Sequence, residues 1–145
     1  MEAPVSQILA YKGTRVECVA STATVCEAVA RMNDRNIGAV VVLDGERPIG
    51  IFTERDVLTR IVGRRLDGAR TSVTEVMTRS LVTISPATTV HDAMRIVTDT
   101  RCRHLPVLHE GQLVGLISIG DLTRWVVVDQ QRTIEDLTDY ICRTG

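Results

Sequence analysis

The chain has 145 residues, 44% apolar and 24% charged, and a formal net charge of −1 from 17 basic and 18 acidic residues. This balance and only four aromatic side chains argue against a nucleic-acid-binding protein, which needs a basic field or stacking platforms. No apolar run approaches the roughly 20 residues that cross a bilayer, so we expect no membrane partner. The remaining classes are globular enzymes, binding modules and interaction proteins.

The cysteines and the N-terminus indicate a cytoplasmic protein. Cys18, Cys26, Cys102 and Cys142 show no Cys-x-x-Cys spacing and lie within apolar segments, so we expect reduced, mostly buried thiols. The first residues, M-E-A-P, form neither a basic start nor an apolar secretory core. Disulfides or a zinc site are the alternative, but the three histidines offer no helical ligand pair, and we expect no metal.

The first half of the chain begins with a strand and a helix. Residues 15–19 are β-rich and predict a short strand. Apolar residues at i, i+3, i+4 and i+7 between positions 25 and 32 predict a helix with one apolar face. Thr24 and Glu27 have the spacing of a capping box at its start, which gives both a structural role.

A hairpin and a second helix follow. The apolar runs 39–43 and 48–52 flank the polar turn 44–47, and short β-branched runs around a glycine-containing turn predict an antiparallel hairpin. The next helix begins near Asp56. The arginines around the following connector are expected to form a solvated rim; they are Arg60, Arg64, Arg65 and Arg70.

The chain then repeats itself. Residues 22–57, moved forward by 65 positions, fall on residues 87–122 without a gap. The second copy predicts a strand at 81–84, a helix at 90–97, a hairpin of 105–108 and 113–117, and a last helix from near Asp121. Thr89 and Asp92 have capping-box spacing at the start of its first helix, which gives them a structural role as well. Each unit is therefore β-α-β-β-α.

Two further segments complete the organisation. Residues 5–9 resemble 73–77 at an offset of 68, so three extra residues precede the first strand of copy one. Residues 133–142 have apolar residues at helical spacing and predict a small helix that packs back. We expect a mixed α/β (α+β) fold whose two units pack about a pseudo-twofold axis, with an added C-terminal helix. The predicted domains are 1–65 (repeat one with a leading helix), 66–128 (repeat two with its linker) and 129–145 (a helical tail).

Both copies end in Gly, two apolar residues and [Thr/Ser]-x-x-Asp, which supplies Thr53 with Asp56 and Ser118 with Asp121. One interpretation is structural, because a hydroxyl followed three residues later by an acid is itself a capping box. The other is functional. A helix N-terminus favours phosphate, the hydroxyl adds a hydrogen bond, and the carboxylate can accept from vicinal ribose hydroxyls. Recurrence at the same register in both copies favours the functional interpretation.

With these endings, the run Arg103-His104-Leu105-Pro106-Val107 and the linking residues 73–78, the sequence resembles a tandem pair of CBS domains over nearly its whole length. It is most similar to small stand-alone bacterial CBS-pair proteins. The resemblance implies intertwined sheets, two clefts between the copies, an adenine nucleotide ligand (AMP, ATP or NAD), and disc-like homodimers. The downstream protein target is unknown.

The resemblance also implies the site residues. The first cleft would use Thr53, Arg55 and Asp56, with Ile84, Ser85, Ala87 and Cys102 from the other copy. The second would use Ser118 and Asp121, with Arg103 and His104 near the phosphates and Ile37, Gly38, Ala20, Ser21, Thr22 and Ala23 lining its base.

The two copies differ where phosphates are expected. Copy one has Gly38 and Ala39 where copy two has Arg103 and His104, so we expect unequal clefts and a larger role for Arg55 in the first. These features favour a regulatory, ligand-sensing module. The alternative is a ligand-free protein–protein interaction scaffold. An enzyme is disfavoured, because no Gly-x-Ser-x-Gly nucleophile elbow surrounds Ser118.

Overall fold

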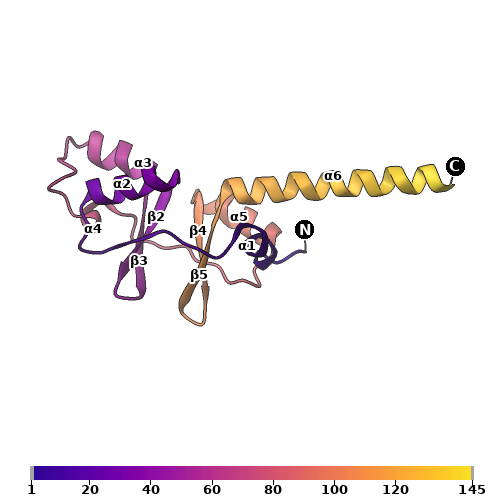
Figure 1. Ribbon diagram of the computed structural model, residues 1–145, viewed down its shortest axis with the longest axis horizontal. Coiled ribbons are helices and arrows are strands. Elements are labelled where there is room, and N and C mark those ends of the chain that lie inside the picture. Colours follow the sequence, from indigo (N-terminus) through magenta and orange to yellow (C-terminus); the bar gives the residue numbers. More distant parts are fainter. Residues whose placement is uncertain (1, 145) are drawn as a thin grey trace.

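The computed structural model describes residues 2–144 (Figure 1). In chain order the elements are α1 (Ser6–Lys12), β1 (Cys18–Ala20), α2 (Val25–Arg35), β2 (Ala39–Asp44), β3 (Arg47–Thr53), α3 (Glu54–Asp56), the π-helix η1 (Val57–Val62), α4 (Val73–Val76), α5 (Val90–Thr100), β4 (His104–His109), β5 (Gln112–Ser118) and α6 (Ile119–Thr144).

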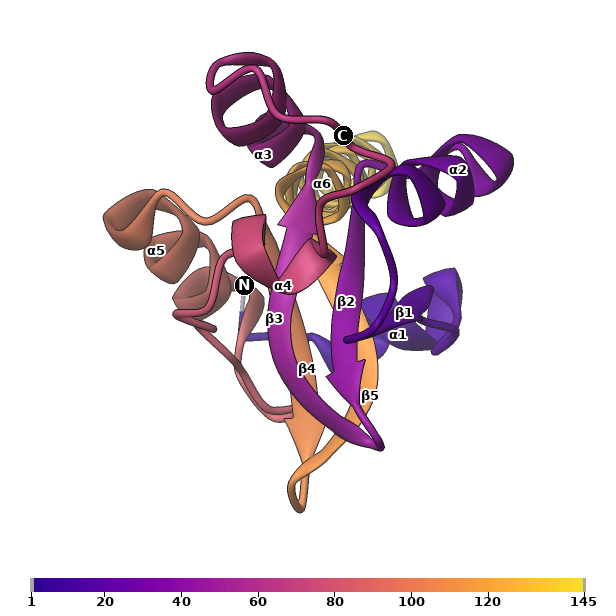
Figure 2. The ribbon, with the colours of Figure 1, turned by 90° about the vertical axis from the view of Figure 1, so that its left-hand side faces the viewer.

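The predicted mixed α/β fold with two similar units is confirmed. In the first sheet β1 runs parallel to β2, and β2 pairs with β3 in an antiparallel hairpin. In the second sheet β4 pairs antiparallel with β5. The two hairpins lie side by side in the body of the molecule, from which α6 projects to one side (Figure 1, Figure 2). The last residues of β3 and β5, Thr53 and Ser118, therefore both lie at the boundary between the two units.

The first strand of the second unit is reduced to one bridge. The predicted strand at 81–84 is wrong, since only Ile84 pairs with β4, at Val107. In the first unit Val41 donates its N–H to the carbonyl of Glu17 at 3.2 Å, but the matching residue in the second unit is Pro106. Proline has no N–H to donate, so the ladder cannot extend.

The helices α2 and α5 begin where the capping residues predicted. The Thr24 hydroxyl accepts from the backbone N–H of Glu27 at 3.2 Å, and the Thr89 hydroxyl accepts from that of Asp92 at 3.1 Å. Each helix turns its apolar face to the core of its own unit. The structural role assigned to these threonines is confirmed.

The leading helices are exchanged between the two cores. Val5, Ile8 and Leu9 around α1 pack into the second core, whereas the matching residues of α4, with Met77, pack into the first. The approach is close, because a Cβ on Gly115 of β5 would lie 2.6 Å from Leu9 Cδ2. The units are thus interlocked, which fixes the geometry of the space between them.

The C-terminal segment forms no separate helix. It continues α6 as one helix of 26 residues that projects from the body (Figure 1). The prediction that residues 133–142 pack back is wrong, since Ile134, Leu137 and Ile141 are 62%, 57% and 66% exposed. No glycine or proline lies between Asp121 and Thr144 to end the helix.

The cysteines are free but less buried than predicted. Cys26 and Cys142 are exposed, and Cys18 and Cys102 are partly buried. The expectation of mostly buried thiols is therefore wrong: Cys26 lies on the outer part of α2 and Cys142 on the projecting part of α6. Within residues 2–144, no helix is both long and apolar enough to cross a bilayer.

Candidate functional site

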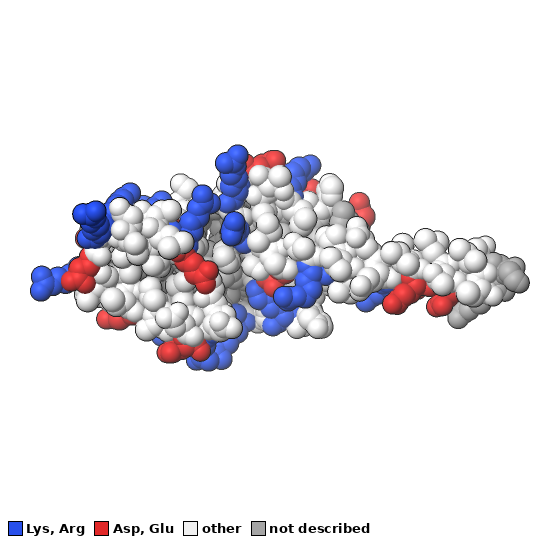
Figure 3. All heavy atoms as spheres, turned by 90° about the horizontal axis from the view of Figure 1, so that it is seen from above, with Lys and Arg blue, Asp and Glu red and all other residues white. Residues whose placement is uncertain are grey.

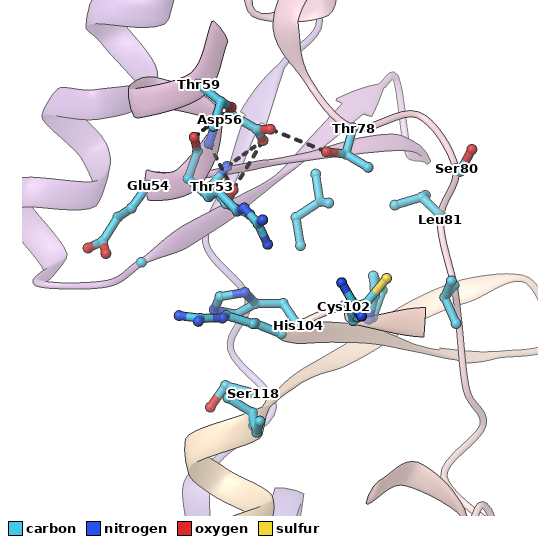
Figure 4. A pocket seen from close by; sticks show the side chains of 18 of the residues that line it. Thr53, Glu54, Asp56, Thr59, Thr78, Ser80, Leu81, Cys102, His104 and Ser118 are labelled. Atoms are coloured by element: carbon cyan, nitrogen blue, oxygen red, sulfur yellow. Dashed lines mark hydrogen bonds between the residues drawn. The ribbon is translucent and has the colours of Figure 1, made fainter. Parts of the chain in front are cut away.

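A pocket of about 630 Å³ lies between the two units. Basic side chains gather around the hollow between the two lobes (Figure 3). In the close view, Thr53, Asp56 and Thr78 form one wall, and Cys102, His104 and Ser118 face them (Figure 4). The pocket is lined by Gly38, Ile51, Thr53, Glu54, Arg55, Asp56, Thr59, Arg60, Thr78, Ser80, Leu81, Val82, Arg101, Cys102, Arg103, His104, Pro106, Ser118, Ile119 and Gly120.

Asp56 is the most constrained group of the first wall, with 5% of its surface exposed. One carboxylate oxygen accepts from the Thr53 N–H at 3.0 Å and the Thr53 hydroxyl at 3.2 Å, while the Asp56 N–H donates to that hydroxyl. The other oxygen accepts from the Thr78 hydroxyl at 3.3 Å. The capping-box interpretation is thus confirmed, and it also holds the carboxylate at the pocket wall.

Arg60, which also lines the pocket, pairs with this carboxylate. Its Nε lies 3.6 Å from Asp56 Oδ1, and its guanidinium donates to the carbonyls of Val76 and Met77 at 3.0 and 2.8 Å. The prediction of a solvated rim is wrong for this arginine, because the π-helical η1 directs it toward the end of α4. The contact links the Thr53 motif to the segment that leads into the second unit.

The facing wall comes from β4 and the end of β5. The structure places Arg103, His104 and Ser118 in the same pocket as Thr53 and Asp56, although the sequence had associated them with Asp121. Burial lowers the pKa of the His104 imidazole below its ordinary value of 6.5, and the Lys12 ammonium lowers it further. The ring is therefore neutral at neutral pH and free to gain a proton beside an anion.

The pocket also has an excess of uncompensated positive charge. Within the described residues, the guanidinium groups of Arg55, Arg101 and Arg103 form no ion pair or hydrogen bond. Glu54 lines the same pocket and offsets one of these charges. Several unpaired guanidinium groups beside an apolar wall suit a ligand that carries phosphate.

Only part of the predicted residue set meets here. Gly38, Thr53, Arg55, Asp56, Cys102, Arg103, His104 and Ser118 line the pocket. The others lie elsewhere: Ala20, Ser21 and Thr22 at the end of β1 and the turn after it, Ala23 and Ile37 in or against the first core, Ile84 in the second core, Ser85 and Ala87 in the turn before α5, and Asp121 on α6.

The sequence missed the segment that follows α4. Thr78, Ser80, Leu81 and Val82 line the pocket because Thr78 pairs with Ile51 of β3 through two backbone hydrogen bonds. This pairing brings the linker of the second unit onto the first. The change of offset from 65 to 68 is the one sequence signal that marks this junction as irregular.

Asp121 does not face this pocket. It lines a smaller cavity of about 220 Å³ between α1 and α6, where Lys12 Nζ lies 2.6 Å from its Oδ2. Its own capping box with Ser118 is complete, with bonds of 2.8 and 3.1 Å. Within residues 2–144, no group of three or more His, Cys, Asp and Glu side chains is arranged to hold a metal ion.

The family model of the CBS domain matches twice, at residues 5–63 and 73–128. The chain belongs to the CBS-domain family. Each match contains its own exchanged leading helix and its own [Thr/Ser]-x-x-Asp motif, so the chain is a CBS pair. Tandem CBS pairs of this kind are regulatory and signal-transduction modules.

The CBS pair has relatives of known sequence and structure. It is 40% identical over 123 residues to the mitochondrial CBS domain-containing protein CBSX3 of Arabidopsis thaliana, covering 81% of this chain but only 60% of that relative's length. A candidate signal-transduction protein with CBS domains from Burkholderia ambifaria has a TM-score of 0.84 and 38% identity, over 88% of this chain and 96% of that one. A CBS domain protein from Pyrobaculum aerophilum, solved as a complex with AMP, has a TM-score of 0.73 and 27% sequence identity. The match covers 81% of this chain and 88% of that one.

Proposed function

We propose that this CBS pair senses an adenine nucleotide of the AMP, ATP or NAD type in the pocket between its repeats, without catalysing a reaction. The observation that carries the proposal is the composition of that one pocket. It combines a fixed carboxylate at Asp56, three unpaired guanidinium groups and an apolar wall. These three elements match the ribose, the phosphates and the base of a nucleotide.

Each part of the ligand has a partner of suitable chemistry. The apolar side chains of Ile51, Leu81, Val82 and Pro106 can sandwich the base. The Asp56 carboxylate can accept from the ribose hydroxyls, since two of its present bonds come from threonine hydroxyls that can rotate away. The free arginines can pair with the phosphate oxygens. The AMP complex of the Pyrobaculum relative supports this choice of ligand.

We further propose that the pair acts as a homodimer on an unidentified target protein. Apolar side chains recur on α6 at intervals of seven, three and four residues and are exposed: Val127, Ile134, Leu137 and Ile141. A nucleotide can regulate such an assembly only if its affinity differs between two arrangements of the chain. Because all four cysteines are free, a reducing, cytoplasmic setting fits this proposal.

Nucleotide binding is expected to raise the melting temperature of the purified chain. A ligand at about 100 times its Kd stabilises the native state by about 2.7 kcal/mol, which corresponds to roughly 5–10 °C for a chain of this size. The measurement is thermal unfolding in the presence of AMP, ATP or NAD. Each nucleotide that raises the melting temperature is then tested by calorimetric titration. If none shifts the transition or binds at millimolar concentration, the proposal is wrong, and a ligand-free scaffold becomes the better explanation.

Binding should also raise the pKa of His104. In the free protein burial holds this pKa below 6.5, with Lys12 and Arg103 also lowering it and Asp121 and Glu54 opposing them. Since protonation then opposes folding, stability falls as the pH drops below 6.5. A phosphate dianion beside the ring favours the imidazolium and reverses the shift. NMR titration of the histidines with and without saturating AMP, with the signal assigned by His104→Gln, should show the rise; an unchanged His104 pKa would place the phosphate elsewhere.

A further inference from the structure

The carboxylate of the second [Thr/Ser]-x-x-Asp motif has a closer cationic partner than that of the first, and the partner comes from another helix. The Lys12 ammonium lies 2.6 Å from Asp121 Oδ2 and also donates to the Leu116 carbonyl at 2.7 Å. In the corresponding carboxylate, Asp56 Oδ1 lies 3.6 Å from Arg60 Nε, accepts from the neutral hydroxyl of Thr78 and faces the 630 Å³ pocket. Two motifs that match in sequence therefore differ in what occupies the ligand side of their carboxylates.

The three extra residues ahead of the first strand explain the difference. α4 ends at Val76, which matches Ile8, whereas α1 continues for about one further turn to Lys12. At the offset of 68, Lys12 matches Ser80, which lines the open pocket. Where the first repeat has an extended segment beside a pocket, the second has a turn of helix whose last side chain reaches the carboxylate.

The electrostatics make Lys12 hard to displace. Burial alone raises the pKa of the Asp121 carboxyl, but the hydrogen bonds from Lys12 and from the Ser118 backbone, with the Lys12 charge, outweigh it and bring the pKa below its ordinary value of 3.8. The Asp121 side chain is 12% exposed and the Lys12 side chain 35%. A ribose would have to displace an ammonium group that lies 2.6 Å from the carboxylate, and it offers only uncharged hydroxyl donors in its place.

We propose that Lys12 is a built-in occupant of the second repeat's carboxylate, so that the chain takes one nucleotide, at Asp56, and not two. The proposal rests on the proposed nucleotide-sensing function and adds its stoichiometry. It makes Lys12 a specificity-determining residue outside the pocket itself. Arg103 and His104, which the family resemblance assigned to the cleft of Asp121, line the pocket of Asp56 instead.

The test is Lys12→Ser, which installs the residue type of the open site. Calorimetric titration with the nucleotide that stabilises the wild type should give one site per chain for the wild type and two for Lys12→Ser. Lys12→Ser combined with Asp121→Asn should return to one site. Arg47→Ser, which removes the same charge from the exposed first residue of β3, should stay at one.

The outcomes separate this inference from the proposed function. A wild type that binds no nucleotide refutes the proposed function. A wild type that binds two, or a folded Lys12→Ser chain that still binds one, refutes the role of Lys12 while nucleotide sensing stands. A readout without ligand checks the ion pair itself: NMR titration of the Asp121 carboxyl should show a higher pKa in Lys12→Ser, and an unchanged pKa would show that the pair is not formed in solution.

Discussion

Asp56→Asn should lower nucleotide affinity by about 100-fold, whereas Asp121→Asn should change it by less than about threefold. A carboxylate that accepts from two ribose hydroxyls loses two charge-assisted hydrogen bonds of about 1.5 kcal/mol each when it becomes a neutral amide, and 1.4 kcal/mol is tenfold in affinity. Asp121 makes the same capping box but is paired with Lys12 and lies outside the pocket. Calorimetric titration of the two variants beside the wild type is the measurement.

The two aspartates are matched controls because both variants should be destabilised. Each carboxylate accepts a backbone N–H at the start of a helix, at 3.0 Å for Asp56 and 2.8 Å for Asp121, and losing such a cap costs about 1 kcal/mol. Denaturant unfolding should therefore show similar losses, with affinity changed in only one variant. Equal loss of affinity in both would mean that the motif acts on ligand binding only through helix stability, and the ribose role of Asp56 would be wrong.

Asp121→Asn should in addition make the free energy of unfolding less dependent on pH under acidic conditions. The pKa of Asp121 in the folded chain lies below its ordinary value of 3.8, so its stabilisation is fully present above that value and is lost as the pH falls through the folded pKa. The amide has no such transition, and the difference between wild type and variant should shrink toward low pH. This readout does not involve nucleotide.

Local patterns predicted the elements well, because they depend on neighbours in sequence. The capping threonines Thr24 and Thr89 and the 3.6-residue period located α2 and α5, and the glycine-containing turns located both hairpins. The failures involve long-range contacts. The apolar face of α1 is compatible with either core, and only the folded chain shows that it enters the second.

The candidate site shows the same division. The carboxylate of Asp56, the guanidinium groups of Arg55 and Arg103 and the imidazole of His104 could be found from the repeat and the family resemblance, since they belong to short motifs. Their grouping into one pocket could not, because it depends on how β4 and β5 lie against β3. Lys12 lies in no motif, and its partner is 109 residues away. Its role follows from the length of α1, which a single sequence does not fix.

Ile134→Glu with Leu137→Glu should convert the proposed dimer into a monomer without unfolding the body. Both residues lie on the projecting part of α6, far from the cores, and are 62% and 57% exposed. Val127, Ile134 and Ile141 follow one another at seven-residue intervals, the spacing that lets two helices pack along a seam. Burying charge in such a seam without a partner opposes association.

A second copy is the occupant that the charges of α6 favour. In an antiparallel pair centred on Ile134, Val127 lies opposite Ile141, and Arg132 of each copy lies opposite Asp136 of the other, so the seam and the charges match together.

Size-exclusion chromatography with light scattering should give twice the chain mass for the wild type and the single mass for the double variant. Arg132→Glu makes the same net charge change off the seam and should weaken the dimer without abolishing it, because it removes only the flanking pair. A wild type that is monomeric at high micromolar concentration would contradict the dimer, and the exposed apolar residues of α6 would then be a binding surface for another protein. A nucleotide that changes the dimer mass or its dissociation constant would link the pocket to α6 through β5, which joins the wall at Ser118 directly to the first turn of that helix.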